Sequence, residues 1–135
     1  MPYLLDTNVL SEPVKPSPNP KLLRWLARHD AEVFVSVLTL GEIVKGIQMM
    51  PSGKRRQRME EWLAEIEQWA ANRLVPVDAA VMREWGAHAA RQSKQGRVLD
   101  VMDSLLAATA LSHGLTLASR NLADFPDVPA VNPWQ

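Results

Sequence analysis

Residues 3–8 read Tyr-Leu-Leu-Asp-Thr-Asn, a short apolar run that ends at an acid and is followed by two residues that often cap helices. The pattern predicts a buried strand that runs directly into a helix. Similar apolar runs predict further strands at residues 32–36, 74–77, 115–119 and, in shorter form, 130–131. Helical spacing of apolar residues predicts helices at residues 22–30, 40–50, 59–70, 79–95 and 100–113. Strands that alternate with helices indicate an α/β fold, a three-layer sandwich with a short parallel sheet of four to five strands flanked by helices.

The composition is that of one globular domain over residues 1–135, because 47% of the residues are hydrophobic and 22% are charged. The chain has no cysteine, which excludes disulfide bonds, thiolate metal sites and cysteine nucleophiles. No apolar run approaches the roughly 20 residues that span a bilayer, and the first residues lack the pattern of a signal peptide. We therefore expect a cytoplasmic protein of the bacterial type that makes no membrane contact.

Basic and acidic residues balance, with 15 Lys and Arg against 15 Asp and Glu. A protein that binds nucleic acid through counterion release alone is usually basic. If this chain acts on nucleic acid, it needs local basic patches, or metal ions that offset its own acids.

Four acids follow predicted strands or begin predicted helices, at the edge of the sheet where α/β proteins bind ligands. Asp6 ends the first strand, and Glu42 lies in the first turns after the second. Asp103 lies in the first turn of the helix that Asp100 opens, and Asp124 follows the fourth strand. We expect the four carboxylates to converge. Asp6 is the strongest candidate, because an acid at the inner end of an apolar strand is half-buried and burying a charge is costly without a partner.

Three of these acids also have a purely structural interpretation. Thr39 and Glu42 have the spacing of a capping box, and Asp100 and Asp103 have a similar one. An acid in the first turn of a helix also interacts favourably with the helix dipole. Asp124 lies in a segment rich in turn-forming residues, where a simple turn would explain it.

Carboxylates that lie close together repel one another, and a divalent cation removes that cost. Mg²⁺ and Mn²⁺ prefer hard oxygen ligands, so a site of this kind predicts metal-assisted hydrolysis of a phosphodiester bond. Short hydrogen-bonding side chains beside the acids are predicted to support the site: Thr7, Asn8, Ser119 and Asn121. The three histidines lie on predicted helices away from the acids, and we interpret His29, His88 and His113 as surface or packing residues.

Four segments of the chain resemble the motifs of PIN-domain ribonucleases, in the order of that family. They are LLDTNVLSE at residues 4–12, SVLTLGEI at residues 36–43, VMDSLLAATA at residues 101–110 and SRNLADF at residues 119–125. Asn-Pro-Trp at residues 132–134 resembles the closing segment of the FitB-like branch. The chain departs from the family pattern in two ways: Ser119 stands where Thr is common, and Asp100 adds an acid beside the third motif.

The resemblance implies a PIN-like fold and a toxin of the VapC or FitB type, from a type II toxin–antitoxin pair. Such toxins are metal-dependent endoribonucleases, and the matching motifs put the Mg²⁺ or Mn²⁺ ligands at Asp6, Glu42, Asp103 and Asp124. They are usually homodimers, and they form heterotetramers or larger assemblies with a small antitoxin that binds operator DNA. The antitoxin commonly inserts a basic side chain into the acidic pocket, which fits the electrostatics of such a site.

Basic and aromatic residues are candidates for contacts with RNA or with a protein partner. The candidate RNA contacts are Arg91, Lys94, Arg97 and Arg120. The basic run at residues 54–58 opens a predicted amphipathic helix, where a solvated surface is the simpler interpretation. Trp62 and Trp69 belong to the apolar stripe of that helix and are predicted to lie in the core. Part of this stripe, or Trp85 and Trp134, are alternatives for a dimer or antitoxin interface.

Two other functions are open on the sequence. A haloacid dehalogenase-like phosphohydrolase would have Asp two positions after its first acid, where this chain has Asn8, and the lysine motif of that family is missing. A PIN-like fold kept as a catalytically silent binding module would be expected to have lost one or more of the acids. All four are present.

Overall fold

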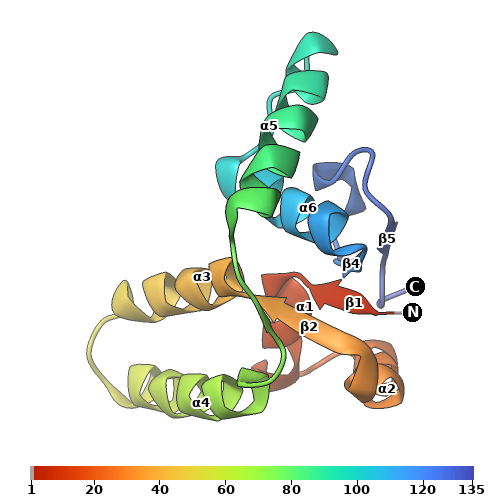
Figure 1. Ribbon diagram of the computed structural model, residues 1–135. Helices are drawn as coiled ribbons and strands as arrows, with labels where there is room; N and C mark the ends of the chain where they lie inside the picture. The colour runs from red at the N-terminus through yellow and green to blue at the C-terminus, as the bar shows by residue number, and fades with distance from the viewer. Residues whose placement is uncertain (1) are drawn as a thin grey trace.

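The computed structural model describes residues 2–135, and its centre is a five-stranded sheet with the strand order β3-β2-β1-β4-β5 (Figure 1). The strands are β1 (Tyr3–Leu5), β2 (Val33–Ser36), β3 (Leu74–Val75), β4 (Thr116–Ala118) and β5 (Ala130–Val131). Every neighbouring pair is parallel. The predicted α/β fold with a short parallel sheet is confirmed, and the first strand lies at its centre.

Helices cover this sheet on both sides. They are α1 (Thr7–Ser11), α2 (Pro20–His29), α3 (Val37–Gln48), α4 (Lys54–Ala70), α5 (Ala79–Lys94) and α6 (Val101–His113). Short 3₁₀ helices lie at η1 (Glu12–Val14), η2 (Asp30–Glu32) and η3 (Leu122–Asp124). In Figure 1, α5 and α6 lie above the strands, α2 and α4 lie below them, and α3 projects to the left. None of the helices between residues 2 and 135 is long and apolar enough to cross a membrane.

The two leucines of β1 explain why the first strand is a continuous apolar run. Successive side chains of a strand point to opposite faces of the sheet. Leu5 packs in a core cluster with residues of α1, α2, β2 and α3, whereas Leu4 packs in a second cluster with residues of α6, β4 and Phe125. Both leucines are fully buried, and burying one such side chain contributes about 1.5–3 kcal/mol. A sheet covered on both faces requires apolar side chains on both.

Three helices begin earlier than their apolar spacing predicts, because residues outside the apolar stripe start them. Asn19 caps α2 by accepting two backbone N–H groups at 2.9 and 3.2 Å, and Pro20 takes the first helical position. Ser36 caps α3 by accepting the Leu38 N–H at 3.0 Å, so this helix begins at residue 37 rather than 40. The basic run forms the first turns of α4, which begins at residue 54 rather than 59. The predicted strand at 74–77 ends at 75, because Pro76 has no N–H for the ladder.

The polar start and stop signals of the last two helices are confirmed. Asp78 caps α5 by accepting the Val81 N–H at 3.0 Å. Asp100 caps α6 by accepting the Asp103 N–H at 3.1 Å. Gly114 ends α6 with a φ of 64°, the left-handed conformation that glycine adopts at little cost. These caps set the direction in which α6 leaves the edge of the sheet.

Candidate active site

Asp6 lies where β1 ends and α1 begins, and both of its carboxylate oxygens accept hydrogen bonds. Oδ1 accepts the backbone N–H of Thr7 at 2.8 Å. Oδ2 accepts the hydroxyl of Ser119 at 2.7 Å and the side-chain amide of Asn8 at 3.3 Å. Asp6 is 9% exposed. Burial raises the pKa of Asp6, and this effect outweighs the lowering by the hydrogen bonds from Ser119 and Thr7.

Glu42 lies in the second turn of α3, and it binds α1 rather than the start of its own helix. The hydroxyl of Thr7 donates to Oε1 of Glu42 at 3.0 Å. The capping-box interpretation of Thr39 and Glu42 is therefore wrong: Ser36 caps α3, and the side chain of Thr39 is fully buried with its hydroxyl unpaired. Burial raises the pKa of Glu42, and nearby carboxylates raise it further.

Asp100 and Asp103 have different roles at the start of α6. Asp100 provides the cap, so the carboxylate of Asp103 is not needed for it. Burial, followed by the negative charges of surrounding acids, raises the pKa of Asp103 to about 6. Those acids are Asp6, Asp100, Asp124 and Glu42. A shift with these causes means that carboxylates from four segments of the chain lie in one electrostatic environment.

Asp124 is the exposed member of the group, at the end of η3. Its charge raises the pKa of both Asp6 and Asp103, so its carboxylate lies within their electrostatic range. None of the ion pairs found among residues 2–135 involves Asp6, Glu42, Asp103 or Asp124. The four acids selected from the sequence thus lie within electrostatic range of one another, and no ion pair among the described residues offsets their negative charge.

The supporting residues connect β1 to β4 through side chains and backbone. Asn8 also donates to the Ser119 hydroxyl at 3.5 Å, and its Oδ1 accepts the backbone N–H of Arg120 at 3.3 Å. Asn121 contributes differently from its neighbours, because its backbone N–H donates to the Ser119 hydroxyl at 3.0 Å. Ser119 is fully buried, so this short network holds the ends of two adjacent strands together beneath the acids.

Glu12 is a further buried acid that the sequence does not single out. It is 5% exposed, accepts the Asn19 N–H at 3.0 Å and pairs with Lys15 at 3.0 Å. The hydrogen bond from Lys15 is the largest of the effects that lower the pKa of Glu12, and the positive charge of Arg120 adds to them. Glu12 ends no predicted strand and has no capping spacing, so its burial could be found only from the fold.

The candidate RNA contacts lie in different parts of the molecule. Arg91 and Lys94 belong to the last turn of α5, the end of that helix that rises away from the sheet in Figure 1. Arg97 pairs with Asp127 at 3.5 Å. Arg120 follows β4 directly; its backbone N–H donates to Asn8, whereas its guanidinium lies 5.4 Å from the centre of the Trp134 ring and its charge lowers the pKa of Glu12.

The interpretation of the histidines as surface or packing residues is confirmed. His88 is fully buried, and His29 packs against two aromatic rings with centroids 4.6 and 5.0 Å away. His113 is exposed at the end of α6.

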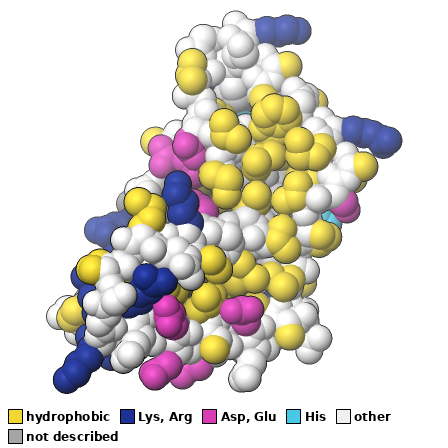
Figure 2. Space-filling view, turned by 90° about the vertical axis from the view of Figure 1, so that its left-hand side faces the viewer, with side chains coloured by type: hydrophobic (Ala, Val, Ile, Leu, Met, Phe, Trp, Pro, Cys, Tyr) yellow, Lys and Arg dark blue, Asp and Glu magenta, His cyan; other side chains and the backbone are white. Residues whose placement is uncertain are grey.

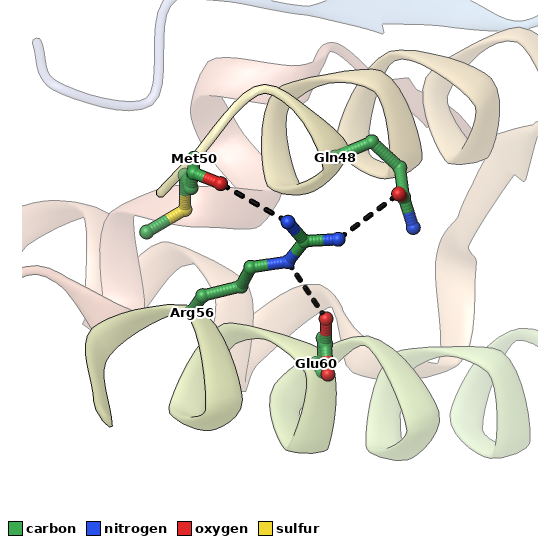
Figure 3. A network of polar contacts seen from close by, with 4 residues as sticks. All are labelled: Gln48, Met50, Arg56 and Glu60. Carbon is green, nitrogen blue, oxygen red and sulfur yellow. Dashed lines mark hydrogen bonds and ion pairs between the residues drawn. The ribbon is translucent and has the colours of Figure 1, made fainter. Parts of the chain in front are cut away.

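The basic run at residues 54–58 is exposed except for Arg56. Figure 3 shows Arg56 between α3 and α4, where its guanidinium donates to the Met50 carbonyl at 3.1 Å, to Gln48 at 3.0 Å and to Glu60 at 3.0 Å. The solvated-surface interpretation holds for the rest of the run. Arg56 itself closes the turn between the two helices.

Trp62 and Trp69 pack against the core cluster of Leu5, as predicted. They also line an open apolar cavity of about 520 Å³ between α1, α2 and α4, together with Leu10 and Leu26. One helix stripe thus serves both the core and a groove that is open to solvent.

A second apolar surface lies on another side of the molecule. Figure 2 faces the left-hand side of Figure 1 and shows hydrophobic side chains gathered across the middle of this face. Exposed apolar side chains of α3, α5 and α6 include Val37, Val44, Met82 and Val101. Contiguous apolar surface of this kind is typical of protein–protein contacts.

The fold and its acidic edge define a class of protein. The family model for the PIN domain matches residues 3–131, nearly the whole chain. The chain therefore belongs to the PIN-domain family, as its four motifs predict. The haloacid dehalogenase alternative is wrong, because the chain has a different fold family.

The chain is similar over nearly its whole length to curated relatives and to a solved structure. The chain is 35% identical to Toxin FitB of Neisseria gonorrhoeae over 97% of each chain, and 33% identical to a VapC ribonuclease of Sinorhizobium fredii over 98% of this chain and 97% of that one. It is also 33% identical to plasmid stability protein StbB of Pseudomonas syringae, over 98% of each. The crystal structure of FitAcB from Neisseria gonorrhoeae superposes with a TM-score of 0.91 at 34% identity, covering 98% of this chain and 99% of that one.

Proposed function

We propose that this protein is an endoribonuclease that hydrolyses phosphodiester bonds in RNA, and that it is the toxin of a type II toxin–antitoxin pair. The observation that carries the proposal is the shared electrostatic environment of four acids in a PIN-domain fold. Full-length similarity to Toxin FitB and to a VapC ribonuclease supports it.

The donor set fits Mg²⁺ or Mn²⁺, with Asp6, Glu42, Asp103 and Asp124 as the residues that would hold the ion. All are hard oxygen donors, and the raised pKa of Asp103, caused by burial and by the surrounding acids, supports the binding of a cation here. In the chain alone, no three of the described His, Asp or Glu side chains are close enough to hold one ion. This arrangement favours an ion that keeps several waters and takes one or two carboxylates directly, as Mg²⁺ usually does. Bound there, the ion would polarise the scissile phosphate and lower the pKa of a water.

The protein side chains have separate tasks in this reaction. Asp6 and Glu42 are oriented by donors from Thr7 and Ser119, so their oxygens are held before substrate binds. Asp103 and Asp124 accept no side-chain hydrogen bond from other described residues, so their carboxylate oxygens are available to the attacking water. An oxygen of Asp103 that does not hold the ion would accept a proton from that water. Arg120 follows β4, and its guanidinium, 5.4 Å from the centre of the Trp134 ring, would bind a phosphate of the RNA.

The same acidic charge favours a basic inhibitor. A small DNA-binding antitoxin that inserts an Arg or Lys would neutralise the four acids and block substrate. Its apolar residues would fit the groove lined by Trp62 and Trp69. We further propose a homodimer through the apolar surface of α3, α5 and α6, with heterotetramers or larger assemblies forming with the antitoxin. A substrate of cellular RNA implies that the toxin acts in the cytoplasm.

The direct test is cleavage of labelled total RNA by the purified protein without antitoxin. Reactions contain Mg²⁺, Mn²⁺ or EDTA, and compare the wild type with Asp6→Asn and with Glu65→Gln, a matched loss of charge on the exposed face of α4. We expect metal-dependent cleavage by the wild type and by Glu65→Gln, and none with EDTA or Asp6→Asn. A folded wild type that binds no divalent metal and cuts no RNA would instead support the silent binding module.

A further inference from the structure

Two polar residues on the buried face of α5 contact the loop that carries Asp124. His88 is fully buried and Gln92 is 1% exposed, and their spacing of four residues puts them on the same face of the helix. Buried polar side chains are costly unless they are hydrogen-bonded. Both find their partners in residues 126–127, which follow Asp124 closely in the chain.

Each contact fixes a different part of the loop. Nε2 of His88 donates to the carbonyl of Pro126 at 3.0 Å, and Nε2 of Gln92 donates to Oδ2 of Asp127 at 2.7 Å. Arg97 completes the set by donating to Oε1 of Gln92 at 3.0 Å and pairing with Asp127 at 3.5 Å. The four side chains His88, Gln92, Arg97 and Asp127 are called the α5 clamp below.

The clamp contacts the loop at a residue with an uncommon backbone conformation. Asp127 has a φ of +62°, the left-handed conformation, which few residues other than glycine, Asn and Asp adopt. The hydrogen bond from the buried Gln92 amide to the half-exposed carboxylate of Asp127 is charge-assisted and favours this conformation. The backbone at Asp127 is therefore set by α5 as well as by the loop itself.

The segment between the clamp and Asp124 is short and packed. Phe125 is 3% exposed and lies in the core cluster of Leu4. Asp124 itself is held by the η3 turn, where its N–H donates to the Asn121 carbonyl at 3.1 Å. Beyond Phe125, the clamp is the next fixed point of the chain, so a shift at Asp127 would be transmitted to an exposed acid that has no side-chain partner of its own.

We propose that the α5 clamp positions Asp124 against Asp6 and Asp103, and that Gln92 and Asp127 are positioning residues for the acidic site. The proposal rests on the proposed function, because it concerns the metal-binding geometry of that site. It also assigns Arg97 to the support of the loop rather than to RNA, and it gives His88 a specific task within its packing role.

The test uses variants that separate the loss of the clamp's hydrogen bonds from a change in the backbone conformation of Asp127. Asp127→Gly removes the carboxylate but adopts a positive φ without strain, whereas Asp127→Asn keeps an oxygen that can accept the Gln92 amide. Gln92→Met removes the same hydrogen bond with little change in volume. Glu65→Gln serves as the remote control. The readouts are Mn²⁺ affinity of the antitoxin-free protein by titration calorimetry, kcat and KM on a labelled RNA, and the thermal unfolding midpoint.

We expect Mn²⁺ affinity to fall about tenfold to a hundredfold in Asp127→Gly and Gln92→Met, the range typical of residues that orient metal ligands. We expect kcat to fall together with the Mn²⁺ affinity while KM stays within about twofold. Asp127→Asn should retain most of the wild-type Mn²⁺ affinity and most of the wild-type kcat. Wild-type Mn²⁺ affinity in Asp127→Gly and Gln92→Met would overturn the inference. An affinity in Asp127→Asn as low as in those two variants would also overturn it. If the wild type itself binds no Mn²⁺ and cuts no RNA, the proposed function fails instead.

Discussion

Asp6 and Asp124 carry the same carboxylate but are positioned in opposite ways. Asp6 is 9% exposed, follows the central strand directly and accepts hydrogen bonds on both oxygens. Asp124 is exposed, lies on a loop, and accepts no side-chain hydrogen bond from the described residues. Asp6 is held both by its chain neighbour Thr7 and by Ser119 of the adjacent strand end, whereas under our proposal Asp124 is positioned through its loop by α5. One acid is thus hydrogen-bonded directly, and the other depends on contacts made by neighbouring residues.

The largest effect should come from replacing these two acids in parallel. We expect Asp6→Asn to lower kcat by about 10²–10³-fold, the range for loss of one pre-organised charge-stabilising group. Asp124→Asn should lower it by about tenfold to a hundredfold, because this oxygen is exposed and water can replace it more easily. Single-turnover cleavage of one RNA at saturating Mg²⁺ measures both. Equal losses would mean that burial does not distinguish the two acids.

Removal of the Ser119 hydroxyl, which donates to Asp6, should have the next largest effect on stability and metal binding. Ser119→Ala deletes a 2.7 Å hydrogen bond to a buried carboxylate and should destabilise the protein by about 1–3 kcal/mol. The pKa of Asp6 should rise further, because the Ser119 hydrogen bond lowers it. Urea unfolding and Mn²⁺ titration at pH 7 measure the two effects. Ser112→Ala, a half-buried serine of α6, is the matched control and should change Mn²⁺ affinity little.

The pH dependence of stability should report Asp103. Its pKa is about 6 in the folded chain against an ordinary value of 3.8, so between about pH 4 and pH 6 the folded state binds more protons than the unfolded state. Stability of the metal-free protein should therefore fall as pH rises through this window. Excess Mg²⁺ should reverse the fall near pH 7 and have little effect near pH 4. Thermal unfolding midpoints across this range measure the pH dependence. Asp103→Asn should show a smaller fall than the wild type, because Asp6 and Glu42 still contribute, and an unchanged profile would contradict the assignment.

The smallest effect should come from the turn between α3 and α4. Arg56→Met removes three hydrogen bonds that lie far along the chain from the acids, and its partly exposed ion pair with Glu60 contributes about 0.3–0.5 kcal/mol. We expect a total loss of about 1 kcal/mol or less, with cleavage unchanged. Urea unfolding and the same RNA assay measure this. A large loss of activity would mean that this turn contributes to RNA binding.

Much of the fold and the acidic site could be predicted because the signals are local. A run of apolar residues that ends at Asp6 predicts both the strand and the place of the acid, and Asp78, Asp100 and Gly114 mark helix ends through their own backbone neighbours. The partner of Glu42 could not be predicted in this way. Thr7 lies 35 residues away in the chain, so the capping-box spacing gave the wrong partner.

The sequence by itself determined the alternation of strands and helices, the ends of the last two helices and the acids that follow the strands, because periodicity and capping act over a few residues. Only the tertiary structure decided that Glu12 is buried, that Arg56 closes a turn, and that His88 and Gln92 hold the loop of Asp124. These interactions join segments brought together by packing of the sheet and its helices. Their energies depend on burial and distance in the folded chain, which no local pattern encodes.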